Sequence, residues 1–316
     1  MYLDDLDILN LKDGIKKAMF VDIDAPFDEE YEPWVLEPLI PREAITILDG
    51  LGGSGKSWFA LDIAYSIGLG QPFLGLFPVK QSGTVLYLTA EEVPQMFYQR
   101  LKTIRKHYPR NENFYWISFL HKDIQLKPYL CMKQRGTLVE TETREVLDFL
   151  MAELQPVLVV LDSLINFYGL DENSSEDAMF FYDTIKTLAK TYGTSFLLLH
   201  HQNKEGMKTQ SADDTISFRG SGVLREQARS RIVYKNIKIT EKTIARKIKL
   251  EKSNYYSRLK DELLPNGSIY LKFENGVHKY DKAFELTAKK AEEEAKNKKK
   301  GKNKKQEEIE DYDIPF

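Results

Sequence analysis

The chain has 316 residues, of which 42% are hydrophobic and 29% are charged, a globular composition that excludes wholesale disorder, collagen and a disulfide scaffold. Its 45 Lys and Arg residues against 48 Asp and Glu leave a formal charge of −3, so any polyanion has to bind a local basic patch. The single Cys131 excludes an internal disulfide and a cysteine-only metal site, which is typical of a reducing compartment.

The beginning of the chain lacks the features of a secretory signal. Its first residues alternate apolar and acidic side chains, without a basic region followed by an apolar run. No apolar stretch elsewhere approaches the roughly 18 residues that a membrane helix needs. We therefore expect a cytoplasmic protein without a membrane partner.

Residues 1–40 are predicted to form an N-terminal arm. They are acidic, carry prolines at positions 26, 33 and 38, and include the bulky residues Trp34 and Leu36. This pattern favours a segment that packs on another part over an independent core.

Residues 41–285 are predicted to form an α/β domain. Continuous apolar runs alternate with amphipathic stretches of helical length, which is typical of a mostly parallel sheet covered by helices on both faces. After residue 230 the pattern becomes alternating, with short polar turns, which predicts an antiparallel extension of the sheet. The parallel strands are predicted at residues 44–50, 83–90, 113–120, 156–162 and 194–200, and the helices at 93–106, 142–153 and 175–192.

A glycine-rich loop follows the first of these strands. Residues 50–57 read G-L-G-G-S-G-K-S, the complete G-x-x-x-x-G-K-S pattern, with an apolar strand before it and helical spacing after it. The glycines allow successive backbone N–H groups to converge on a phosphate, and Lys56 would bridge the β- and γ-phosphates of ATP. The predicted nucleotide-binding residues are Gly50, Leu51, Gly52, Gly53, Ser54, Gly55, Lys56, Ser57 and Trp58.

Acidic residues follow two other predicted strands. Asp162 ends a buried strand, and with the Ser57 hydroxyl it is the predicted Mg²⁺ site, although an Asp in this position also serves as a turn or helix cap. Glu91 and Glu92 end another strand. Either one could activate water as a general base, or both could simply begin a solvated helix.

Taken together, four further segments give the chain a family resemblance. They are TAEEVPQMFYQRL, VLVVLDSL, LLLHHQNK and RGSGVLREQARSR, in this order after the glycine-rich loop. Over about residues 42–256 the chain resembles the RecA-like ATPases, and most of all the plasmid RepA-type hexameric replicative helicases, which have relatives in phages and mobile elements. The resemblance implies that Glu91 is the catalytic base, that Asp162 serves Mg²⁺, and that His201 is the γ-phosphate sensor. A hydrogen-bonded core histidine is the alternative for His201.

The same resemblance predicts residues that act on a neighbouring copy. Arg229 takes the position of the arginine finger, and Lys252 the position of a second cation supplied in trans, each with a plain surface charge as the alternative. A guanidinium suits the charge that develops during phosphoryl transfer. The prediction is therefore a homo-oligomer, either a ring such as a hexamer or a filament.

The polar segment between His201 and Gly220 is predicted to be a loop that faces single-stranded DNA. It contains Lys204, Lys208 and Arg219, which could contact phosphates. Because Phe218 is its only aromatic residue, we expect contacts with the nucleic-acid backbone and no base-specific readout.

The C-terminal residues are predicted to form two further regions. Residues 286–306 are rich in Lys and Glu and are interpreted as a flexible, disordered linker, with a frayed helix at its start as an alternative. Residues 307–316 resemble the acidic tip of bacterial single-stranded-DNA-binding proteins, which implies docking to a primase, polymerase or repair protein. A solubilising tail is the alternative. The predicted docking residues are Asp311, Asp313, Ile314, Pro315 and Phe316.

These observations predict a Mg²⁺-dependent ATPase that acts on single-stranded DNA in replication or recombination, most simply a RepA-like ring helicase. Two alternatives stay open. One is a phage annealing protein or recombinase that forms filaments, and the other is an ATP-switched adaptor that recruits replication proteins through its tail. Displacement of a strand from a forked duplex with ATP distinguishes the helicase from both alternatives.

Overall fold

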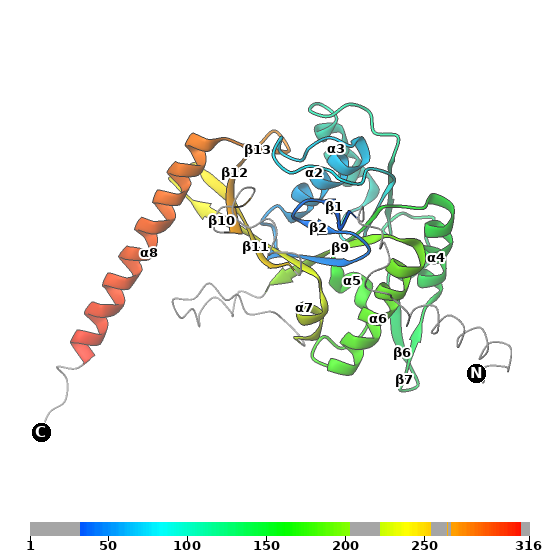
Figure 1. Cartoon of the computed structure of the whole chain (residues 1–316). Helices are drawn as coiled ribbons and strands as arrows, with labels where there is room; N and C mark the ends of the chain where they lie inside the picture. Colours follow the sequence, from blue (N-terminus) through cyan, green and yellow to red (C-terminus); the bar gives the residue numbers. More distant parts are fainter. Residues whose placement is uncertain (1–31, 203–221, 254–263, 265–266, 311–316) are drawn as a thin grey trace, which may run out of the picture. The chain divides into compact units, whose positions relative to one another are not determined.

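The computed structural model describes residues 32–202, 222–253, 264 and 267–310 (Figure 1). The chain divides into two compact units, Met1–Pro33 and Trp34–Phe316. Almost all of the first unit, and with it most of the predicted N-terminal arm, lies outside the described residues. Within the described residues, no helix combines the length and the apolar character needed to cross a membrane.

The second unit is built on a nine-stranded sheet with the strand order β13-β12-β11-β10-β3-β9-β8-β4-β5. All neighbours from β10 to β5 are parallel, and β10 to β13 are antiparallel, so both the predicted parallel sheet and its antiparallel extension are confirmed. The strands are β3 (Ile45–Leu51), β4 (Val85–Thr89), β5 (Phe114–Ser118), β8 (Leu158–Asp162), β9 (Ser195–Gln202), β10 (Ser230–Lys238), β11 (Ile244–Ser253), β12 (Ser268–Glu274) and β13 (Val277–Tyr280).

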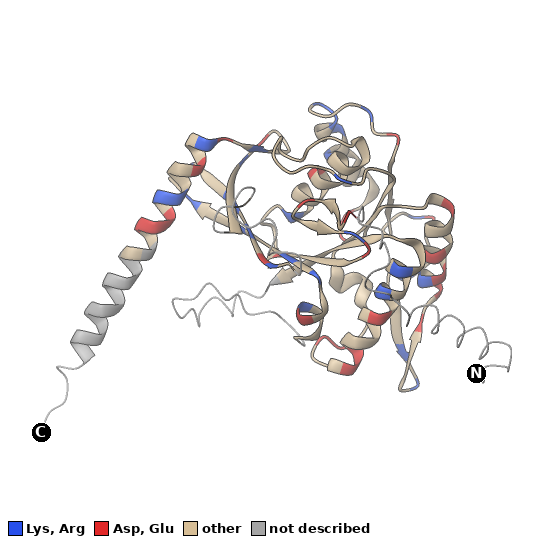
Figure 2. Cartoon of the chain, in the orientation of Figure 1, with Lys and Arg blue, Asp and Glu red and all other residues tan. Residues whose placement is uncertain are grey.

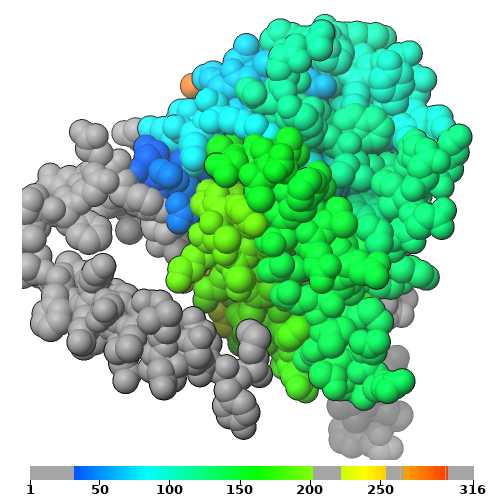
Figure 3. All heavy atoms as spheres, turned by 90° about the vertical axis from the view of Figure 1, so that its right-hand side faces the viewer, coloured from blue at the N-terminus to red at the C-terminus, as the bar shows by residue number. Residues whose placement is uncertain are grey.

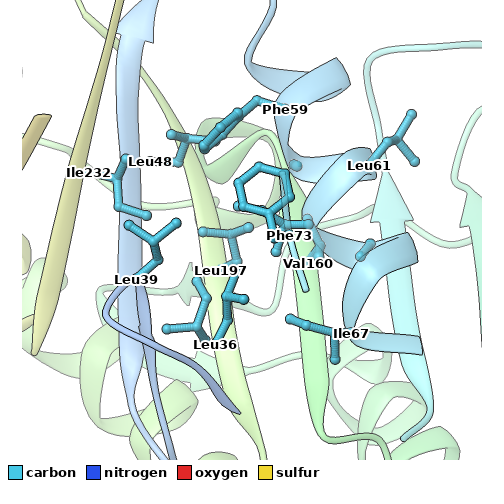
Figure 4. Packing of buried hydrophobic residues seen from close by; sticks show 14 of the residues in the cluster. Leu36, Leu39, Leu48, Phe59, Leu61, Ile67, Phe73, Val160, Leu197 and Ile232 are labelled. Atoms are coloured by element: carbon cyan, nitrogen blue, oxygen red, sulfur yellow. The ribbon is translucent and has the colours of Figure 1, made fainter. Parts of the chain in front are cut away.

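Helices cover both faces of the sheet, which makes the predicted three layers. Alternate residues of each strand point to opposite faces, so Leu48 packs on the side of α2 while Ile47 packs on the side of α6. Figure 4 shows the first of these cores, where Leu48, Val160 and Leu197 of the sheet meet Phe59 of α2. One layer contains α2 (Lys56–Leu69) and α3 (Pro94–Ile104), and the other contains α4 (Glu142–Leu154), α5 (Leu164–Tyr168), α6 (Ser175–Tyr192) and α7 (Val223–Gln227).

Two small two-stranded sheets were not predicted. β1 (Trp34–Leu36) pairs with β2 (Ile40–Pro41), and their buried apolar residues join the first core, although all but Pro41 lie within the predicted arm. β6 (Cys131–Gln134) pairs with β7 (Thr137–Glu140) beside α5 and α6. Strands of two to four residues carry too little periodicity to be recognised from the sequence alone.

The last helix, α8 (Lys282–Glu310), covers residues 286–306, the segment that was predicted to be a linker. Its beginning is fixed to the sheet, because Ala288 is buried against Tyr270 and Glu292 accepts hydrogen bonds from Lys247 Nζ at 2.8 and 2.9 Å. Lys, Glu and Ala are also strong helix formers. Residues 311–316 of the predicted tip lie outside the described residues.

Four parallel strands bring their carboxyl ends to the same edge of the sheet, which positions the candidate site. β3, β9, β8 and β4 are consecutive neighbours. Their register pairs Gly50 with His201, and Thr89 with Asp162. Residues distant in the sequence therefore meet at this edge, where ligands bind in open α/β sheets.

Candidate functional site

The glycine-rich loop joins the carboxyl end of β3 to the beginning of α2. Gly55 caps the helix with φ 110°, a conformation that favours glycine, and it contributes no side chain to bond the first N–H groups. Gly50 is required by close packing, since a Cβ there would lie 2.6 Å from the carbonyl oxygen of Tyr234. The loop therefore presents a helix N-terminus whose backbone donors are available to an anion.

Ser54 supports the same interpretation of the loop. Its hydroxyl oxygen is buried and has no hydrogen-bond partner within the described residues. Buried polar atoms in folded proteins are nearly always satisfied. An acceptor such as a phosphate oxygen, bound at the loop, would provide the missing partner.

Lys56 lies at the centre of the site. Its Nζ donates to the carbonyl oxygens of Gly50 at 2.8 Å and Leu51 at 3.0 Å, and lies 3.1 Å from His201 Nδ1. Burial lowers the pKa of Lys56 to about 8, against the opposing effect of nearby carboxylates. A bound polyanion would favour the charged ammonium further, so this cation is placed to bind phosphate.

Glu91 and His201 form the next part of the site. Because Lys56 can only donate, His201 Nδ1 accepts, and Nε2 donates to Glu91 Oε1 at 2.7 Å. Glu91 also accepts a hydrogen bond from the Ser163 hydroxyl. The bond from His201 is the main reason that the pKa of Glu91 is lowered. The result is an ionised carboxylate that can accept a proton from water.

Glu92, the other candidate for the base, faces a different partner. Its carboxylate forms an ion pair with Arg100 of α3, with Arg100 Nε 2.7 Å from Glu92 Oε2. Glu91, and not Glu92, therefore contacts the residues around Lys56. The sequence left this choice open because the two glutamates are adjacent and differ only in where their side chains lie.

Asp162 lies beside Glu91 at the end of β8. Its Oδ2 accepts a hydrogen bond of 2.7 Å from the hydroxyl of Tyr87, and its carboxylate also bonds the Ser57 hydroxyl. Burial raises the pKa of Asp162 to about 6. The helix-cap alternative does not apply, because Ser163 is the N-cap residue of α5.

The donor set around Asp162 fits a magnesium ion that is bound mainly through a nucleotide. Within the described residues, no group of three or more His, Cys, Asp or Glu side chains could hold a metal ion. Ser57 and Asp162 are two adjacent oxygen donors. Mg²⁺ typically combines one or two such protein oxygens with waters and substrate phosphates, so this pair is sufficient for it.

Replacing Asp162 by Asn should stabilise the nucleotide-free protein at neutral pH while it impairs hydrolysis. The carboxyl has a pKa of about 6 in the fold and 3.8 as its ordinary value, so keeping it ionised is unfavourable above pH 6. We expect a gain in unfolding free energy of about 1–3 kcal/mol above pH 6, shrinking to nothing as the pH falls from 6 to below 4. Denaturant titrations from pH 4.5 to 8 measure it. A loss of stability at pH 8 would contradict the buried, ionised carboxylate.

The sequence analysis missed Tyr87, and it predicted Trp58 without its side-chain contacts. Tyr87 is fully buried in β4 and holds Asp162. A tyrosine inside an apolar strand signals a buried hydroxyl that needs a partner, but nothing in the sequence tells which one. Trp58 was predicted to bind nucleotide. Its ring lies under the Arg100 guanidinium at 4.9 Å and 5.8 Å from Phe273, which leaves its backbone N–H at the loop.

The two cations predicted to act in trans lie together at the opposite edge of the sheet. Arg229 is exposed, and its backbone N–H donates to the Ile45 carbonyl at 3.0 Å, at the beginning of β3. Lys252 Nζ donates to the carbonyl oxygens of Arg225 and Glu226. Burial, and after it Arg229, lowers the pKa of Lys252. Figure 2 shows the Lys and Arg residues of β10 and β11 in blue.

The distance between these cations and Lys56 follows from the strand register. Gly50 lies five positions after Ile45 in β3. At about 3.3 Å per residue, this corresponds to about 16 Å. Arg229 is thus not part of the cluster around Lys56 in its own copy. The predicted DNA-facing residues Lys204, Lys208 and Arg219 lie outside the described residues, as do the docking residues 311–316.

A family model described as an AAA domain matches residues 13–207, more than half of the chain. The match spans the glycine-rich loop, Glu91, Asp162 and His201. It ends before Arg229 and Lys252.

Proposed function

The chain belongs to the AAA-domain family of P-loop ATPases, and on that premise we propose that it is a Mg²⁺-dependent ATPase that translocates along single-stranded DNA as a ring of identical copies. The observation that carries the proposal is the division of the predicted residues between two edges of one sheet. Lys56, Glu91 and His201 are in contact at one edge, and Arg229 is exposed at the other.

Hydrolysis is proposed to use the residues at the loop edge. The backbone N–H groups after Gly55 and the Lys56 ammonium bind the phosphates. Glu91 orients the attacking water and accepts its proton, and His201, which touches both Lys56 and Glu91, holds the two in register. Ser57 and Asp162 would hold Mg²⁺, which would supply positive charge to the phosphate oxygens.

The opposite edge is proposed to serve the next copy. Arg229 lies roughly 16 Å along the sheet from its own loop and cannot complete its own site. A head-to-tail arrangement places this edge of one copy against the loop edge of its neighbour, and such contacts close into rings or continue as filaments. A hexameric ring is the form that we propose.

Single-stranded DNA is the proposed track because of where β9 leads. His201 lies one residue before the end of β9, and the segment with Lys204 and Lys208 follows directly. The sensor that would contact phosphate is therefore close in sequence to basic residues that could bind the phosphates of a nucleic acid. Residues 311–316 are proposed to recruit replication or repair proteins.

Strand displacement from a forked DNA duplex tests this function. We expect the wild-type protein to release the labelled strand when ATP and Mg²⁺ are present. The matched Glu91→Gln variant should bind ATP but leave the labelled strand in the duplex. Annealing of complementary strands without displacement would instead favour a filament-forming annealing protein. ATP binding without DNA-stimulated turnover would favour an adaptor, and either outcome would contradict the helicase.

A further inference from the structure

Four ionisable side chains are linked to one another in a row across four strands of the sheet. We call His200, Asp49, Arg231 and Glu251 the interstrand ion chain, because they come from the adjacent strands β9, β3, β10 and β11. His200 Nδ1 lies 2.7 Å from Asp49 Oδ1, and Arg231 donates to both Asp49 and Glu251. Asp49 is completely buried, and His200 and Arg231 are 5% and 4% exposed.

Members of the interstrand ion chain are adjacent in sequence to both halves of the proposed catalytic machinery. Asp49 directly precedes Gly50, whose carbonyl accepts from Lys56, and His200 directly precedes His201. Arg231 lies two residues after Arg229. It is also the cross-strand partner of Lys252.

Arg231 itself is excluded as a cation that reaches a neighbouring copy. It is buried, and its guanidinium is held between carboxylates from the strands on both sides of β10. Arg229, by contrast, is exposed, and its side chain forms no hydrogen bond or ion pair with the described residues. Its direction therefore depends on how the beginning of β10 is held.

Burying these charges is not explained by stability alone. Taking an ion pair out of water is costly, and well-packed apolar residues often stabilise a fold equally well. What a guanidinium between two carboxylates adds is geometry, since its planar fork accepts only a narrow range of orientations. The interstrand ion chain thus fixes β10 relative to β3 and β11 at the level where β10 begins.

We infer that Arg231 is a positioning residue: by linking Asp49 to Glu251 it holds Arg229 in the direction needed to reach the ATP site of the neighbouring copy. The inference rests on the proposed shared site. It predicts that a copy without the Arg231 guanidinium can no longer provide Arg229 effectively to its neighbour. The same copy's own loop, base and sensor should still support hydrolysis.

Mixed assemblies separate these two roles. A receiver, Arg229→Ala, keeps its own site but supplies no finger, and a supplier, Glu91→Gln, supplies the finger but has no base. We expect a mixture of the two to hydrolyse ATP. With the supplier Glu91→Gln/Arg231→Lys, we expect turnover of the mixture to fall on the order of tenfold or more, because displacing a catalytic group by about 1 Å can cost about a hundredfold.

The converse mixture shows that the variant is folded. The receiver Arg229→Ala/Arg231→Lys, mixed with the Glu91→Gln supplier, should turn over like Arg229→Ala in the same mixture. The matched control is Arg144→Lys in the supplier, because Arg144 of α4 also lies between two carboxylates, 3.1 Å from Glu140 and 3.5 Å from Asp148. We expect this control to leave the mixture's turnover unchanged.

The helix layer that contains α4 is the green part of the surface in Figure 3.

The outcomes distinguish the inference from its premise. Undiminished turnover with the Arg231→Lys supplier would overturn the positioning role, and so would equal losses as supplier and as receiver. If Arg231→Lys does not fold, Glu251→Gln is the second variant, because it removes one carboxylate at the partly exposed end of the interstrand ion chain. It should lower the turnover of the mixture as a supplier and not as a receiver, by a smaller factor than Arg231→Lys. If even the unmodified supplier rescues nothing, the shared site itself is wrong and the inference falls with it.

Discussion

Replacing Lys56 by Ala should lower ATP turnover by about a hundredfold to a thousandfold, the usual effect of removing one group that stabilises charge in a transition state. The Lys56 ammonium is buried and lies between the loop carbonyls and His201. No other Lys or Arg of the described residues is hydrogen-bonded to this loop. Turnover at saturating ATP measures the effect.

The matched control for this variant is Lys102→Ala on α3. Lys102 is exposed and lies over the ring of Tyr98, 4.8 Å from its centroid. We expect Lys102→Ala to keep the wild-type rate. If Lys56→Ala kept the wild-type rate as well, the glycine-rich loop would not be the site of hydrolysis.

Replacing Arg229 by Ala should separate binding from hydrolysis. Arg229 is remote from the loop of its own copy, so ATP affinity should change little, whereas turnover should fall by about a thousandfold or more, as expected for an arginine finger. A titration with fluorescent ATP measures the first quantity, and steady-state turnover the second. Lys56→Ala should lower both.

The control for Arg229 is Arg110→Ala. Arg110 is 77% exposed and forms a surface ion pair with Glu112, which contributes little to stability. Its replacement should leave both binding and turnover unchanged. A fall in ATP affinity for Arg229→Ala as large as the fall in turnover would place Arg229 in its own copy's site, against the register of β10 and β3.

The sheet could be predicted because each strand is recognisable from its own apolar residues. Strands buried on both faces read as continuous apolar runs, and their alternation with helical stretches leaves a parallel sheet as the simple solution. The strand order, in which β3 lies between β10 and β9, is not written in any single segment. It depends on which apolar faces match in three dimensions.

The residues of the site could be predicted where they belong to a sequence motif, but most contacts between them could not. The loop at residues 50–57 carries its own geometry, because glycines and a following helix are sufficient to build an anion site. The contact between His201 and Glu91, the hydrogen bond from Tyr87 to Asp162 and the interstrand ion chain all join residues that are distant in the sequence and lie in or directly after different strands. Their partners are set by strand register, which the sequence alone does not show.

The central claim is that two copies build each ATP site, and turnover in a mixture of inactive variants tests it most directly. Arg229→Ala and Glu91→Gln should each be nearly inactive alone. Mixed in equal amounts, they form productive head-to-tail pairs at about a quarter of the interfaces, so we predict turnover well above the sum of the separate rates. A rate no greater than that sum, in assemblies shown to contain both variants, would contradict the shared site.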